Sequence, residues 1–161
     1  MDNENPQVKE VDQKRIKLKF TDGKLKEISK ETIFELLRDI KDPEHPLTLE
    51  QLNVIQIDDI ETGEIEQDEE CVCKLGFPIK FIKINFTPTV PHCSLVGIIG
   101  LCLHYQLKKY TNDIWVQIKI KKDSHAQETS YNRQLEDNER VTAAFENEAL
   151  MEIINECVPD L

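Results

Sequence analysis

The segment Leu95–Tyr110 constrains the fold of this chain most strongly, because it is apolar around nearly its whole circumference as far as His104. A helix that is hydrophobic on every side is buried rather than laid on a surface. Ser94 precedes the segment at the N-cap position, and Lys108 and Lys109 suit the negative C-terminal end of a helix. The sequence therefore predicts a buried helix at the centre of the fold.

Strand patterns lie on both sides of this helix. Ile82, Ile84 and Phe86 alternate with more polar residues before it, and Ile114–Ile120 alternates after it. A strand, a helix and a second strand of these lengths have the dimensions of a βαβ unit, which is right-handed if the strands are parallel. We therefore predict the α/β fold class, with a small mixed β-sheet packed by helices and a buried central helix that follows a Pro-His-Cys loop.

Weaker periodicities surround this unit. Further helices are predicted after the N-cap Ser29, ending at Asp42-Pro43, and over Thr129–Leu135, Asn138–Phe145 and Glu148–Cys157. Thr48 and Gln51 have the spacing of a capping box and predict a short helical turn. A strand is predicted over Asn53–Ile60, and the acidic segment Glu61–Glu70 is predicted to be a turn or loop.

The chain divides into an arm and a domain. Residues 1–29 are polar and charged, and we expect a flexible N-terminal arm there, in which the alternation over Ile16–Phe20 adds at most an edge strand. Residues 30–161 are expected to form one α/β domain.

The charge balance excludes several classes of partner. Lys and Arg total 20 against 31 Asp and Glu, which gives a formal net charge of −11. Direct binding to nucleic acid phosphates or to an anionic membrane needs a positive surface, so neither is expected. The chain has no apolar run long enough for a transmembrane helix, and its first residues lack the apolar core of a signal peptide. We expect a cytoplasmic protein that can also enter the nucleus.

The five cysteines are expected to be reduced thiols, because an odd number and no secretion signal argue against a disulfide framework. Cys102 and Cys157 fall in apolar helical patterns and are predicted to be small buried hydrophobes. Cys71 and Cys73 are one residue too close for the common zinc spacing, and no second pair completes a site.

Cys93 has the most informative position. It lies in the loop Phe86–Leu95, which joins a strand to the N-terminus of the predicted central helix. Unpaired N–H groups and the helix dipole favour negative charge there, so a thiol is biased toward the reactive thiolate. Pro88 and Pro91 restrict the loop, and His92 and Ser94 flank the cysteine. Cys93 is therefore the candidate functional thiol.

Two other interpretations of Cys93 stay open from the residues alone. Ser94 can cap the helix while Cys93 only fills a small hole beneath it, since free cysteine is among the most buried residue types. A Cys–His hydrolase is the other interpretation, although the sequence identifies no acid that would orient the histidine.

The other histidines carry weaker signals. His45 lies between two prolines in a turn predicted to be exposed and solvated, and His104 is predicted on the polar side of the central helix. His125 follows a predicted strand, where loops often carry functional residues.

Three stretches carry a family resemblance: Asp42–Leu52, Phe86–Ser94 with its Pro-His-Cys-Ser motif, and Glu139–Ala144. They resemble the eukaryotic cytosolic iron–sulfur assembly component 2 family, also called the Mip18 family, whose core is related to bacterial SufT and PaaD proteins. The resemblance covers about residues 31–158, and the turn at Asp42–Pro46 is closer to the general-purpose branch of the family.

The resemblance implies a non-enzymatic adaptor. The family works in the cytosolic targeting complex with a WD-repeat propeller protein and a HEAT-repeat scaffold, and it helps to deliver 4Fe–4S clusters to apo-proteins. It has also been linked to chromosome segregation. No tightly bound cofactor is implied, and exchange of elements between protomers in the family implies that a homodimer can form.

The motif cysteine of the family matches Cys93, which implies a transient or shared contact with a 4Fe–4S cluster, with His125 as a neighbour. Two features depart from the family pattern. Cys71–Ile79 resembles an insertion, so Cys71 and Cys73 inherit no role, and Asp123-Ser124 replaces the usual Gly-Thr before His125. The alternatives are a purely structural scaffold in which Cys93 only packs, or a thiol-dependent enzyme that uses Cys93.

Overall fold

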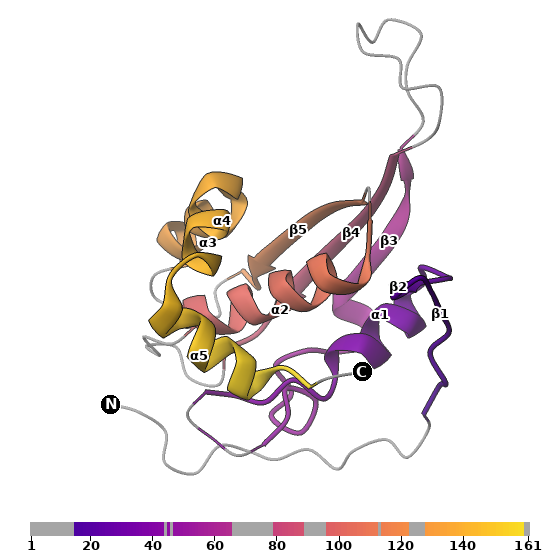
Figure 1. Ribbon diagram of the computed structural model, residues 1–161, viewed down its shortest axis with the longest axis horizontal. Helices are drawn as coiled ribbons and strands as arrows, with labels where there is room; N and C mark the ends of the chain where they lie inside the picture. The colour runs from indigo at the N-terminus through magenta and orange to yellow at the C-terminus, as the bar shows by residue number, and fades with distance from the viewer. Residues whose placement is uncertain are drawn as a thin grey trace, which may run out of the picture.

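The computed structural model describes residues 15–43, 45, 47–65, 79–88, 96–112, 114–122 and 128–159. The strands are β1 (Phe20–Thr21), β2 (Lys24–Leu25), β3 (Ile60–Ile65), β4 (Ile79–Phe86) and β5 (Ile114–Ile120). The helices are α1 (Lys30–Leu37), α2 (Val96–Tyr110), α3 (Glu128–Glu136), α4 (Asn138–Phe145) and α5 (Glu148–Cys157), with a short 3-10 helix at Ile57–Asp59. The predicted α/β fold class is confirmed (Figure 1).

The main sheet has the strand order β3-β4-β5. β3 and β4 form an antiparallel hairpin, in which Ile60 is opposite Ile84. β4 and β5 are parallel, with Phe86 opposite Ile120, and α2 makes the connection between them. The strand–helix–strand unit predicted from the sequence is therefore present, and the sheet is mixed as expected.

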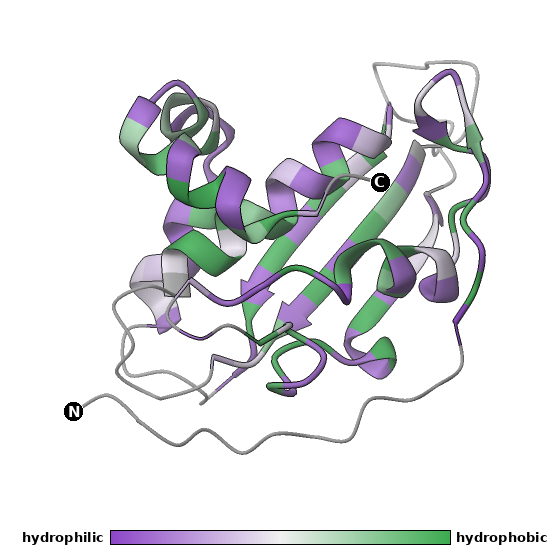
Figure 2. Cartoon of the chain, turned by 60° about the horizontal axis from the view of Figure 1, so that its bottom comes forward, coloured by the Kyte–Doolittle hydropathy of each residue, from purple (hydrophilic) through white to green (hydrophobic). Residues whose placement is uncertain are grey.

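α2 lies against the sheet, with α1 and α5 beside it and α3 and α4 beyond the β5 side (Figure 1). Ile82, Ile84 and Phe86 of β4 are buried on this face, and so are Leu103 and Leu107 of α2. Alternating apolar and polar bands along the strands are visible in Figure 2. The central helix is therefore buried by the sheet on one side and by other helices on the other, as its sequence predicts.

Phe81 and Lys83 of β4 and Trp115 of β5 lie on the opposite face of the sheet. Trp115 is 45% exposed there, and the Lys83 Nζ atom lies 5.2 Å from the ring centroid of Phe81 and 5.9 Å from that of Trp115. Gly63 of β3 is opposite Phe81, and a Cβ atom at Gly63 would approach the Phe81 ring to 2.8 Å. Glycine at this position leaves room for the Phe81 ring against the neighbouring strand.

The N-terminal part of the described chain forms a separate hairpin. Phe20–Thr21 pairs with Lys24–Leu25 around Gly23, whose φ of +77° is in the left-handed region. The alternation over Ile16–Phe20 therefore does not extend the main sheet. The Ser29 side chain accepts a hydrogen bond from the Thr32 N–H, so the predicted N-cap of the first helix is confirmed, although α1 ends at Leu37 rather than near Asp42.

The predicted strand over Asn53–Ile60 is wrong. Asn53 has a φ of +59°, Ile57–Asp59 forms a 3-10 turn, and the strand begins at Ile60. It continues through Ile65, which the sequence interpretation placed in an acidic loop. The reason is tertiary: Ile60 faces the core while Glu61 and Glu64 are exposed, and pairing with β4 stabilises a segment of low intrinsic strand propensity.

A buried ion pair connects α1 to the turn that follows it. The Arg38 Nε and Nη2 atoms donate to the two carboxylate oxygens of Glu50 at 2.8 and 2.6 Å, and Nη1 donates to Glu35 at 2.9 Å. Glu50 lies beside the predicted capping box, which is confirmed because the Thr48 N–H donates to Gln51 Oε1 at 3.0 Å and the Gln51 N–H donates to Thr48 Oγ1 at 3.2 Å.

Replacing Gly100 by valine should destabilise the fold by about 1–3 kcal/mol, as overpacking of a dense core does. A Cβ atom at Gly100 would lie 2.7 Å from two methyl carbons of Leu135, where α3 packs on α2. Urea unfolding measures the change. Ala149→Val, on the exposed side of α5, is the matched control and should change stability by less than about 1 kcal/mol. Equal stability of the two variants would contradict close packing at Gly100.

Candidate functional site

The residues predicted to carry function, His92, Cys93, Ser94 and His125, lie outside the described residues. Cys71 and Cys73 also lie outside them. Two candidate segments, residues 89–95 and 123–127, contain these residues. The structure does describe the strands that precede the two segments and the helices that follow them. Those elements give the site its framework.

The two segments begin at neighbouring points of the sheet. β4 ends at Phe86 and β5 at Ile120, and these residues are opposite each other in the parallel register. The Lys121 N–H donates to the Phe86 carbonyl oxygen at 2.8 Å, and the Thr87 N–H donates to Val54 O at 2.9 Å. Because both strands point the same way, the chain leaves both at the carboxyl edge of the sheet, where open α/β sheets commonly bind ligands.

The two segments also end at neighbouring points. Residues 89–95 lead into α2 at Val96, and residues 123–127 lead into α3 at Glu128. The first turns of these helices are in contact, because a Cβ atom on Gly97 would lie 3.3 Å from Cε1 of Tyr131. The framework therefore brackets the segments that contain Cys93 and His125 at both of their ends.

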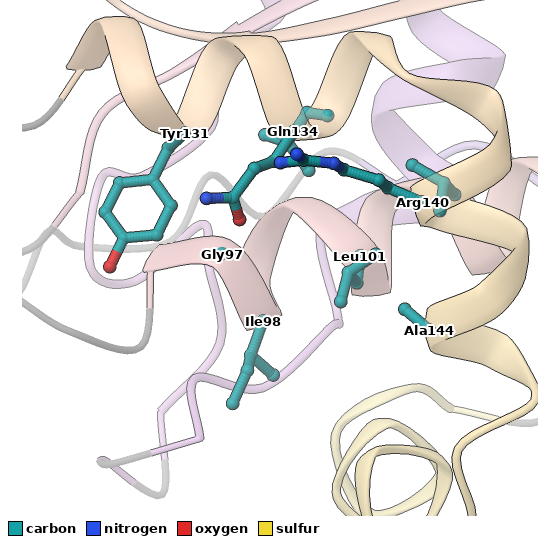
Figure 3. Close-up of a pocket in the computed structure, with 9 residues that line it drawn as sticks. Gly97, Ile98, Leu101, Tyr131, Gln134, Arg140 and Ala144 are labelled. Carbon is teal, nitrogen blue, oxygen red and sulfur yellow. The ribbon is translucent and has the colours of Figure 1, made fainter.

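A cavity of about 200 Å³ opens beside this contact. α2 contributes Gly97, Ile98 and Leu101, α3 contributes Tyr131, Gln134 and Leu135, and α4 contributes Arg140, Val141 and Ala144 (Figure 3). Figure 3 shows the Tyr131 ring beside Gly97 and the polar groups of Gln134 and Arg140 on the α3–α4 side. An apolar floor with an amide and a guanidinium at the rim suits an apolar side chain followed by a hydrogen-bond acceptor.

Sequence interpretation missed this cavity. No motif marks Tyr131 or Gln134, whose positions depend on how α3 packs. Two signals were present: the glycines of α2, which indicate a close approach, and the stretch Glu139–Ala144, which contains Arg140. The groups that approach Gly97 and Gly100 are the side chains of Tyr131 and Leu135, both on α3.

His104 is buried, so its predicted place on the polar side of the central helix is wrong. It is 8% exposed, and its Nε2 atom lies 3.1 Å from the Leu135 carbonyl oxygen. Burial lowers the pKa of His104 to about 4, with a smaller contribution from the charge of Lys108, and the hydrogen bond to Leu135 opposes this shift. His104 is therefore a neutral hydrogen-bond donor near pH 7.

His45 is half-buried rather than fully solvated. Its backbone N–H donates to Asp42 Oδ1 at 3.2 Å, within the turn that follows α1. An Asx-type contact of this kind holds a turn in shape.

Cys102 and Cys157 are buried free thiols, as predicted. The hydrogen bond between their side chains, followed by burial, raises the pKa of Cys102. A thiol with a raised pKa stays protonated near neutral pH and is a poor nucleophile and a poor metal ligand. Among the described ranges, no three His, Cys, Asp or Glu side chains come together in a way that could hold a metal ion. Within the same ranges, no helix has the length and hydrophobicity needed to cross a bilayer.

The chain is similar over most of its length to proteins of several eukaryotes. A MIP18 family protein of Caenorhabditis elegans is 47% identical, with 78% of this chain and 72% of the relative aligned. A MIP18 family protein of Schizosaccharomyces pombe is 38% identical, with 96% and 94% aligned. Cytosolic iron-sulfur assembly component 2B of Mus musculus is 39% identical, with 78% and 70% aligned. No protein-family model matches the chain.

Proposed function

This chain belongs to the MIP18 family, and we propose that it acts as a non-enzymatic adaptor in cytosolic iron–sulfur protein assembly. Relatives from Dictyostelium discoideum and Mus musculus, at 37% and 39% identity, are named cytosolic iron-sulfur assembly component 2B. Those names support a role in assembly rather than catalysis. In the proposed role the chain works in the cytosol, and also in the nucleus, as one component of a larger complex.

The partners in this proposal are a WD-repeat propeller protein and a HEAT-repeat scaffold, which together form a targeting complex. In this proposal the complex delivers 4Fe–4S clusters to apo-proteins. The proposal also includes a link between the complex and chromosome segregation. The net charge of −11 favours basic surfaces on the partners and disfavours direct contact with nucleic acid.

One observation supports the proposed role of Cys93. The β4 and β5 ends are adjacent, and the first turns of α2 and α3 touch at Gly97 and Tyr131. Cys93 is three residues before α2 and His125 is three residues before α3. Because three residues span at most about 10 Å, we propose that Cys93 and His125 lie near this edge.

The cluster is cargo in this proposal, and one cysteine of this chain is not enough to hold it. Stable 4Fe–4S clusters usually take four thiolate ligands. Cys102 and Cys157 are 0% and 5% exposed, so their sulfur atoms are not accessible to a cluster. Cys93 is therefore proposed as a transient or shared ligand, with the remaining ligands from a partner, a client or a second protomer.

Replacing Cys93 by alanine should reduce cluster transfer to an apo-protein by on the order of ten-fold or more, because a soft thiolate ligand is lost. The measurement is anaerobic transfer of a 4Fe–4S cluster from the reconstituted complex, followed by its absorption spectrum on the client. Cys71→Ala and Cys73→Ala are matched controls and should transfer normally.

Pull-downs of the propeller and the HEAT-repeat protein separate ligand loss from loss of assembly. Cys93→Ala should still bind both partners. Normal transfer by this variant would remove Cys93 from the mechanism and leave a scaffold, in which a lower melting temperature would indicate that Cys93 only packs. Turnover of a small thioester by the parent chain, abolished by Cys93→Ala, would instead indicate a thiol-dependent enzyme.

A further inference from the structure

A cavity of about 390 Å³ lies between the N-terminal hairpin and the first turn of α1. The hairpin strands β1 and β2 lie at the periphery of the fold (Figure 1). The residues that matter for the chemistry of the cavity are Ile16, Lys17, Lys19, Leu25, Lys26 and Glu27. The proposed function makes no use of them.

The hairpin segment has the opposite charge to the rest of the chain. Residues 15–30 contain six Lys and Arg against two Asp and Glu, which gives a net charge of +4, whereas the remaining residues have a net charge of −15. Three lysines and Glu27 line the cavity, so its described lining has a net charge of +2. An anionic ligand is therefore attracted to this part of the surface and repelled by most of the rest.

The lysines of the cavity are available to a ligand. Two other cations of the segment already have partners: the Arg15 guanidinium donates to Asp39 at 2.6 and 2.9 Å, and Lys24 Nζ donates to the Lys109 carbonyl oxygen at 2.7 Å. The three cavity lysines are exposed, and within the described ranges none of them has an ion pair or a side-chain hydrogen bond. Their ammonium groups can therefore pair with carboxylates from outside the chain.

The hairpin also places two of these lysines opposite each other. Phe20 pairs with Leu25, and the ladder continues by one step because the Lys26 N–H donates to the Lys19 carbonyl oxygen at 3.0 Å. Opposite residues in an antiparallel pair have Cβ atoms about 5 Å apart, and like charges at such positions are destabilising. A carboxylate between the two ammonium groups would offset their repulsion.

Apolar surface adjoins the lysines. Ile16 and Phe20 are 39% and 38% exposed, and they are two of the four large hydrophobic residues exposed in the described part of the chain. Ile16 and Leu25 line the cavity itself. A free phosphate would leave this apolar surface in water, whereas a peptide with an apolar side chain would cover it. The acidic character of the whole chain disfavours nucleic acid and an anionic membrane as the occupant.

We propose that this cavity binds an acidic segment of a partner protein, in which apolar residues are flanked by carboxylate-bearing residues. The carboxylates pair with Lys17, Lys19 and Lys26, and an apolar side chain packs against Ile16 and Leu25. The site is independent of cluster delivery, so failure of either proposal leaves the other unaffected.

The test uses the full chain and a fluorescein-labelled peptide of sequence Asp-Glu-Leu-Asp-Glu-Leu-Asp-Glu, with fluorescence anisotropy as the readout. We expect a saturable increase that weakens several-fold when NaCl is raised from about 50 to about 300 mM, because salt screens exposed ion pairs. The neutral peptide, with Asn and Gln in place of Asp and Glu, should bind about ten-fold more weakly. A peptide with serine in place of leucine should bind about three-fold more weakly.

Matched variants separate this site from general charge attraction. Lys17→Gln/Lys26→Gln should weaken binding of the acidic peptide about ten-fold. Lys80→Gln/Lys122→Gln makes the same change in net charge at two exposed lysines outside the lining, and it should bind within about two-fold of the parent. Ile16→Ser should remove the preference for the leucine peptide over the serine peptide. Ile16 and all four lysines are exposed, so these variants are expected to fold.

Several results would overturn the proposal. They are equal binding of the acidic and neutral peptides, equal effects of the two double lysine variants, and the absence of a saturable change with the parent chain. Tighter binding to phosphatidylserine vesicles or to a single-stranded oligonucleotide than to the acidic peptide would also overturn it, because the occupant would then be a membrane or a nucleic acid.

Discussion

Replacing Arg38 by methionine should lower the free energy of unfolding by about 3–5 kcal/mol, the range observed when one partner of a buried ion pair is removed. Arg38 is 2% exposed, and its guanidinium makes two hydrogen bonds to Glu50 and one to Glu35. Without it, the Glu50 carboxylate stays in the core with no counter-charge. Urea unfolding followed by far-UV circular dichroism measures the loss.

Two variants test whether burial is the cause. Arg15→Met also removes an arginine that contacts Glu35, but Arg15 is largely exposed and bonds mainly to Asp39, so the expected loss is at most about 1 kcal/mol. The double variant Arg38→Met/Glu50→Leu should recover most of the stability, because an apolar pair leaves no unpaired carboxylate at position 50 in the core. If Arg15→Met costs as much as Arg38→Met, desolvation of Glu50 does not explain the effect.

Acidification should remove up to about 3 kcal/mol of stability through His104 alone, since each unit of pKa difference corresponds to about 1.4 kcal/mol. Burial lowers the pKa of His104 from 6.5 to about 4 in the folded chain. Above pH 6.5 the imidazole is neutral in both states and the contribution is complete. Between pH 6.5 and 4 mainly the unfolded chain binds the proton, so stability falls as the pH decreases through this window.

Urea unfolding at pH 7, 6, 5 and 4, with the parent chain and His104→Gln, measures this contribution. Glutamine keeps an N–H that can donate to Leu135 O but does not titrate. The advantage of the parent over the variant should shrink steadily as the pH is lowered. A constant difference between the two chains, or an NMR titration of the His104 ring centred near 6.5, would contradict the burial of this side chain.

The parts of the fold with strong hydrophobic periodicity could be predicted from the sequence. α2, β4 and β5 alternate or repeat so clearly that their bounds agree with the structure to within about three residues. β3 could not be predicted, because Glu61, Gly63 and Glu64 have low strand propensity and the segment becomes a strand only through its pairing with β4.

The candidate site could also be predicted only in part from the sequence. The position of Cys93 between a strand and a helix could be inferred from local sequence, and the parallel pairing of β4 and β5 follows from the βαβ pattern. The cavity at Tyr131 and the burial of His104 could not be inferred. Both depend on how α3 packs on α2, and helix packing is set by side chains distant in sequence.

β4 has neighbours that are synthesised before it and after it, and this matters during translation. β3 precedes β4, so the antiparallel half of the sheet can form as the ribosome releases the hairpin. The other side of β4 presents unpaired amides until the polypeptide has been extended through Ile120. A nascent chain in this interval has an open apolar edge of the kind that chaperones bind and that otherwise promotes aggregation.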